Sequence, residues 1–214
     1  MTAATKKSVI VKQGLRMLAG AVCGAVGVIA FMEAGGKASL DSDDPGVIVA
    51  IITGLSYALM GLAVGLGALA PRQGAVFLNV EDEEEIREQR QSLLPSAASC
   101  ILIGVFLLIL ALAPVGGGGE LTLWAAAAAA CLVAMVAIAL SMRKRTDELM
   151  RQISLESSAL TLYVALTVLS VWGMLAHLGL APWLTPLTLI AGLAALQLVL
   201  IFWVVQRKGL MAVR

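Results

Sequence analysis

Long apolar segments alternate with short polar ones along this 214-residue chain. Each apolar segment is close to the 20 or so residues that an α-helix needs to cross the hydrocarbon core of a bilayer. The expected spans are 15–32, 47–69, 96–113, 121–142, 158–178 and 183–205. The pattern therefore predicts six transmembrane segments in one integral membrane domain, residues 1–214.

The apolar segments are continuous, whereas strands of a membrane barrel alternate apolar and polar residues. Backbone groups in lipid must be hydrogen-bonded within the protein, so continuous segments are expected to be helices. The fold class predicted is all-α, a polytopic membrane protein with six transmembrane helices. Composition agrees, because 60% of residues are hydrophobic and 14% are charged, with a mean hydropathy of +0.94.

All of the 15 Lys and Arg residues except Lys37 lie in every second gap between the apolar segments. An excess of Lys and Arg is typical of cytoplasmic loops and sets orientation. We therefore expect both termini in the cytoplasm and location in a bacterial inner membrane. The basic N-terminus also resembles a signal peptide, but the apolar segment after it is long enough to span, and we interpret it as an uncleaved first helix.

The two inner loops share a pattern of acidic residue, Glu, any residue, apolar residue and Arg. It occurs at Glu83–Arg87 and again at Asp147–Arg151. Both segments are predicted to be helical stems, about 80–94 and 143–157, each carrying an acid–base pair four residues apart. Pro95 is expected to break or bend the first stem before its span, whereas the second should run uninterrupted into the membrane. A duplicated helical-hairpin unit would leave such a pattern.

The segment Thr146–Ser158, TDELMRQISLESS, resembles a family of small, uncharacterised bacterial inner-membrane proteins. These have a DELxRxIxxEA-type motif just before a transmembrane hairpin. The matching residues are Asp147, Glu148, Leu149, Arg151, Ile153 and Glu156, while Ser157 replaces the usual Ala. The resemblance covers about the last 70 residues. It implies topology, because no activity is established for that family.

The candidate structural or interaction residues are the charged residues of the two stems. They are Glu83, Glu84, Arg87, Asp147, Glu148, Arg151 and Glu156. They would form a docking surface or a salt-bridged junction, or else a solvated stem whose charges keep it out of lipid. Glu156 lies closest to an apolar segment, where an unpaired carboxylate would cost about 3 kcal/mol. Arg151 or Arg90 is the expected partner.

No pattern of catalytic, cofactor-binding or metal-binding residues is present, so we expect no enzyme, no cofactor and no metal. His177 is the only histidine, and no span has an Asp, Glu, Lys or Arg in its central part. A ligand site built from Ser56, Tyr57 and Tyr163 is the weaker alternative to ordinary hydrogen bonding within the helices. The net charge of +1 gives no indication of a nucleic-acid partner.

Small residues four apart, such as Gly54/Ala58 and Gly61/Gly65, predict close helix packing. The alanine run Ala125–Ala130 suggests that the fourth span is a tightly packed central helix. Trp124 and Trp183 are expected at the outer interface and Trp203 at the inner one.

The function expected is that of a non-catalytic accessory, assembly or regulatory protein. Its partners would be the lipid bilayer and another membrane protein or a second copy of itself. One alternative is a small transporter or channel-like protein for an uncharged or lipophilic solute, using gaps beside Gly54, Gly61 and Gly65. A membrane enzyme acting on lipids is the other, and the missing acid–base residues disfavour it.

Overall fold

The computed structural model describes residues 44–72, 83–113, 121–142 and 148–209, together with the single positions Gly24, Gly27, Ile29 and Glu33. The side chains of residues 83, 85 and 121 are outside that description, as is Asp147. The expected first span, 15–32, lies outside the described residues apart from Gly24, Gly27 and Ile29.

The described part of the chain is helical, and five of its helices are long and apolar enough to cross a membrane. They are α3 (Pro45–Leu69), α5 (Glu83–Leu112), α6 (Leu121–Met142), α7 (Glu148–His177) and α8 (Pro186–Arg207). These helices cover the second to sixth expected spans. The prediction of an α-helical membrane protein is confirmed to that extent.

Two helices are longer than a bilayer requires. α5 and α7 have 30 residues each. At 1.5 Å per residue each is about 45 Å long, against a hydrocarbon core of about 30 Å. Each therefore combines a stem and a span in one helix. The expected continuity of the second stem is confirmed from Glu148 onward. Of the break or bend expected at Pro95, the break is wrong, because α5 continues through that residue.

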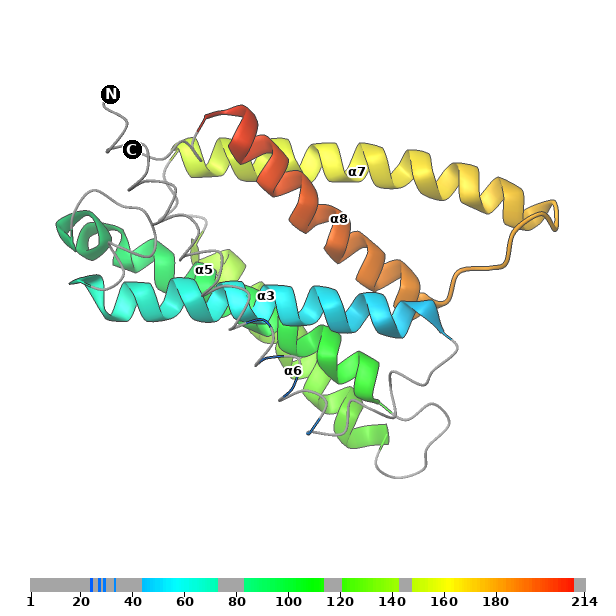
Figure 1. Cartoon of the computed structure of the whole chain (residues 1–214), viewed down its shortest axis with the longest axis horizontal. Helices are drawn as coiled ribbons and strands as arrows, with labels where there is room; N and C mark the ends of the chain where they lie inside the picture. The colour runs from blue at the N-terminus through cyan, green and yellow to red at the C-terminus, as the bar shows by residue number, and fades with distance from the viewer. Residues whose placement is uncertain are drawn as a thin grey trace, which may run out of the picture.

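Successive helices run in opposite directions (Figure 1). One end of the assembly holds the C-terminal ends of α3 and α8 and the N-terminal ends of α5 and α7. We call it the basic end, because the described Lys and Arg residues lie there. They are Arg72, Arg87, Arg90, Arg151, Arg207 and Lys208. The opposite end holds Pro45, His177 and Pro186.

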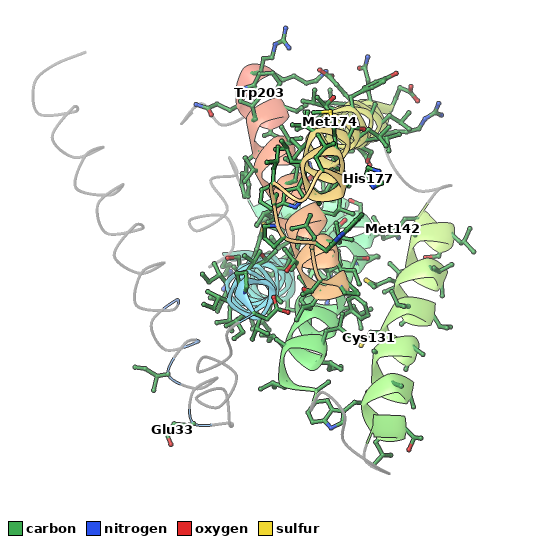
Figure 2. All side chains as sticks on the ribbon, turned by 90° about the vertical axis from the view of Figure 1, so that its right-hand side faces the viewer. Glu33, Cys131, Met142, Met174, His177 and Trp203 are labelled. Carbon is green, nitrogen blue, oxygen red and sulfur yellow. The ribbon has the colours of Figure 1, made fainter. Side chains whose placement is uncertain are left out.

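The helices pack in the order α6, α5, α3, α8, α7. Seen from the opposite end, α6 lies at one edge and α7 at the top of this open series (Figure 2). Both expected hairpin pairs, α5 with α6 and α7 with α8, pack against each other. The central position predicted for the alanine-rich helix is wrong, since α6 packs chiefly on α5. Five of its six alanines in 125–130 are exposed.

The tightest contact joins α3 to α5 through small residues. A Cβ atom added to Gly104 would lie 2.6 Å from the Gly54 oxygen and 2.7 Å from the Ala58 nitrogen. One added to Gly61 would lie 2.7 Å from the Ala97 oxygen. The two backbones can approach this closely only because neither helix has a larger side chain here. The predicted role of Gly54, Ala58 and Gly61 in packing is thus confirmed for this pair.

Candidate functional site at the basic end of the helices

The candidate stem residues lie on two helices that do not pack together closely. Glu84 and Arg87 are exposed on the first turns of α5, and Glu148 and Arg151 are exposed on those of α7. α5 instead packs against α3 and α6, and α7 packs against α8. The structure therefore presents two separate charged stems rather than one cluster of all the candidate residues.

Glu156 forms an ion pair that sequence spacing did not identify. Its Oε2 atom lies 2.7 Å from Nζ of Lys208, and both side chains are partly exposed. Lys208 caps the C-terminal end of α8. The expected partners, Arg151 or Arg90, are therefore wrong for this carboxylate. The pair connects the third turn of α7 to the C-terminal end of α8.

Arg151 pairs within its own helix. Its Nη1 atom lies 3.6 Å from Oε2 of Glu148, one turn earlier, and the side chains are 61% and 80% exposed. An ion pair this exposed contributes between nothing and about 1 kcal/mol to stability. It helps define a charged surface on α7 but does not hold helices together.

A polar contact adjoins the ion pair between α7 and α8. Ser157 is fully buried, and Nε2 of Gln197 on α8 donates to its Oγ atom at 3.5 Å. Thr161 donates to the Ser157 carbonyl oxygen at 2.8 Å. The sequence prediction missed Gln197, although a lone amide in an apolar segment was a visible signal. Together with Glu156–Lys208 this contact fastens the two helices on their basic side.

The end of α8 also carries an aromatic contact. The guanidinium carbon of Arg207 lies 5.4 Å from the ring centroid of Trp203. A cation stacked on Trp at this distance is attracted by the face of the ring. Trp203 and Arg207 form an aromatic and basic pair of the type found at a membrane interface.

At the opposite end, one carboxylate joins the N-termini of two helices. Asp44 caps α3 by accepting from the Gly46 N–H at 2.8 Å. It also accepts from the Thr185 hydroxyl at 3.0 Å and the Thr188 hydroxyl at 3.3 Å. Thr185 in turn caps α8 through the Thr188 N–H. A negative charge is favourable at both positions because helix N-termini carry partial positive charge.

The alternative ligand site of Ser56, Tyr57 and Tyr163 is wrong. Tyr57 is buried on α3, and its hydroxyl donates to the Ala194 carbonyl oxygen of α8 at 3.1 Å. Ser56 donates to the Ile52 oxygen of its own helix. Tyr163 lies on α7 with 70% of its surface exposed. These hydroxyls serve helix packing and local backbone bonds, and they do not converge.

Within the ranges that the structure describes, no three His, Cys, Asp or Glu side chains lie close enough to hold a metal ion. His177 is exposed at the end of α7 and faces the viewer in Figure 2. The described polar side chains join α7 to α8 and α3 to α8, and the exposed charged residues lie at the basic end.

Comparison with known proteins gave no match. No family model, curated protein or solved structure matched this chain.

Proposed function

We propose that this chain is a six-span protein of a bacterial inner membrane with both termini in the cytoplasm. In this proposal it acts there without catalysis, as an accessory, assembly or regulatory component. Its partner is another membrane protein or a second copy of itself. The two stems are its docking surfaces. The resemblance of Thr146–Ser158 to small inner-membrane proteins is consistent with this assignment and carries no activity with it.

The single observation that carries the proposal is the length of α5 and α7. Each exceeds the hydrocarbon core by about 15 Å, or about ten residues. The excess is at the basic end, where exposed charged residues from both stems stand clear of the apolar segments. Such a surface suits a polar partner at the membrane face, because charged rims govern orientation and recognition in protein complexes.

The hydrogen bonds of the described spans fit the same proposal. Tyr57, Ser157 and Gln197 use their polar atoms between helices, while Thr161 and Thr167 use theirs on their own backbones. Such bonds are the usual role of hydroxyls and amides in membrane helices. Of the three glycines expected to border gaps in the transporter alternative, Gly54 and Gly61 have α5 atoms within 3.0 Å of an added Cβ, whereas at Gly65 the nearest atom is Cβ of Ala97 at 3.5 Å.

Native co-purification in mild detergent tests the proposal. We expect a stoichiometric partner, or a defined oligomer, with the wild-type chain. Reversing the exposed pair on α7, with Glu148→Lys and Arg151→Glu together, should release it while leaving the amount of protein unchanged. The same reversal of Glu84 and Arg87 on α5 should also weaken the complex, and comparing the two variants shows how much each stem contributes. A monomer that purifies alone and moves an uncharged solute into liposomes would overturn the accessory role.

Orientation is tested separately. A reporter fused after Arg214 and one inserted near Gly117 should report opposite sides of the membrane, with the first in the cytoplasm. Reporters on the same side would contradict six spans.

A further inference from the structure

The described ends of α7 and α8 at the basic end carry one more cation than carboxylates. Glu148 pairs with Arg151, and Glu156 pairs with Lys208. Arg207 is the third cation, and it is exposed. No carboxylate oxygen in the described ranges lies within 4.0 Å of its guanidinium nitrogens. The two pairs neutralise each other, so the remaining positive charge of this surface is that of Arg207.

The guanidinium of Arg207 is held over an aromatic ring. Its carbon lies 5.4 Å from the ring centroid of Trp203, which is four residues earlier and on the same face of α8. The attraction acts between the cation and the face of the ring. The five N–H donors of a guanidinium lie in the plane of the group and stay available to an acceptor. The ring therefore fixes the position of the charge without occupying its donors.

The length of α8 places this charge at a membrane surface. The helix has 22 residues and ends at Arg207, so it is about 33 Å long, close to the 30 Å or so of a hydrocarbon core. Because Trp203 is one turn before the end of the helix, the guanidinium over it is turned back toward the bilayer. Trp203 is 47% exposed, and Val199, one turn earlier still, is 64% exposed. Figure 2 shows Trp203 at the edge of the described helices. The cation is thus presented at headgroup depth.

A phosphodiester is the acceptor that fits this cation. A guanidinium can donate two parallel N–H bonds to two phosphate oxygens, and such charged bonds are stronger than neutral ones. One phosphodiester also carries the single negative charge that balances Arg207. A zwitterionic headgroup adds a second cation beside Arg207 and Lys208, whereas the glycerol headgroup of phosphatidylglycerol adds none. The site should therefore favour an anionic phospholipid.

We propose that Arg207, positioned by Trp203, binds the phosphodiester of one anionic phospholipid in the leaflet at the basic end. The exposed side of α8 at Val199 and Trp203 then lies beside the upper part of the acyl chains. The site uses neither of the charged stems, so it is independent of the docking role proposed for them.

Quenching of Trp203 fluorescence tests the site. The reporter variant keeps Trp203 and carries Trp124→Phe, Trp172→Phe and Trp183→Phe. In mild detergent it is titrated separately with phosphatidylglycerol and with phosphatidylcholine, both brominated on their acyl chains, since bromine quenches tryptophan on contact. We expect half-maximal quenching at about fivefold less phosphatidylglycerol, the preference that one basic residue near a membrane surface supplies. Arg207→Gln should make the two lipids equal, because it removes the charge and leaves the reporter in place.

Arg90→Gln is the matched control. Arg90 is an exposed arginine at the basic end of α5, and it too has no carboxylate oxygen within 4.0 Å in the part of the chain that the structure describes. Unlike Arg207, it lies over no described aromatic ring. This variant should keep the preference for phosphatidylglycerol. An unchanged preference in Arg207→Gln would overturn the proposal. An equal loss in both variants would also overturn it, by assigning the preference to the overall charge of the basic end.

Inorganic phosphate distinguishes a lipid from a soluble ligand. Added in place of chloride at equal ionic strength, it should leave the preference for phosphatidylglycerol intact, because it lacks the acyl chains that hold a lipid beside Trp203. Loss of the preference in phosphate alone would overturn the lipid assignment and identify Arg207 as a site for a soluble phosphate.

Discussion

The contact between α3 and α5 can be tested by one methyl group placed at two positions. Gly61 and Gly65 are one helical turn apart on α3. A Cβ atom at Gly61 would lie 2.7 Å from the Ala97 oxygen, 2.8 Å from Cγ1 of Ile101 and 2.9 Å from its nitrogen. At Gly65 the nearest atom would be Cβ of Ala97 at an ordinary 3.5 Å. An alanine methyl group would therefore overlap backbone atoms of α5 at Gly61, whereas at Gly65 it would make an ordinary van der Waals contact.

Gly61→Ala should destabilise the protein strongly. Two of its three close neighbours are backbone atoms of α5, which cannot rotate aside, so the helices must separate by several tenths of an ångström. Overpacking of this kind costs about 1–3 kcal/mol. That lowers the folded-to-unfolded ratio about 5- to 150-fold. Gly65→Ala should stay within about 0.5 kcal/mol of wild type.

Equilibrium unfolding in mixed micelles of mild detergent and SDS measures the difference. Thiol labelling provides the signal, because Cys100 is partly buried between helices and Cys131 is buried. The two variants should differ in the free energy of unfolding by at least about 1 kcal/mol, with Gly61→Ala the weaker. Equal unfolding midpoints for Gly61→Ala and Gly65→Ala would refute the close α3–α5 contact as described.

Two further contacts make separate predictions. Glu156→Gln and Lys208→Gln should each lower the free energy of unfolding by between nothing and about 1 kcal/mol. The double variant should lose less than the sum of the two, because the second substitution removes a partner from an ion pair that is already broken. Strict additivity in a double-mutant cycle would show that the two side chains do not interact. Tyr57→Phe removes the hydroxyl that bonds Ala194 and should lose about 0.6 kcal/mol, a typical value for a hydrogen bond between membrane helices. Tyr163→Phe, at an exposed hydroxyl, is its control, and an equal loss in both variants would contradict the α3–α8 bond.

Hydropathy sufficed to predict the five described helices, because lipid allows few alternatives to a helix of spanning length. Pro95 does not break α5, although a break or a bend was expected there. Proline disfavours helix in the residue before it, yet membrane helices tolerate it where neighbours satisfy the freed backbone groups. The length of a helix was thus easier to predict than its continuity.

The arrangement of the helices was harder to predict than their existence. Ala125–Ala130 suggested a central helix, but a small apolar side chain is equally at home against lipid and against protein. Arg151 and Arg90 were the expected partners of Glu156 because they precede spans on the same inner side. Lys208 follows the last span, and its proximity depends on how α8 crosses α7, which spacing along the chain does not specify. Gln197 is uncharged, so a prediction based on charged residues did not include it.

The Asp44 contact has a consequence for how the protein is made. Its threonine partners, Thr185 and Thr188, are 141 and 144 residues later in the chain. They are therefore synthesised after α3, α5, α6 and α7 and together with the start of α8. α3 is complete long before them, and until α8 arrives the Asp44 carboxylate and the Tyr57 hydroxyl lack these bonds. Since chains emerge N-terminus first, the arrival of the final helix closes both contacts at once. Insertion of α8 is therefore the step that forms the last hydrogen bonds of Asp44 and Tyr57, and these bonds separate the incomplete helix assembly from the complete one.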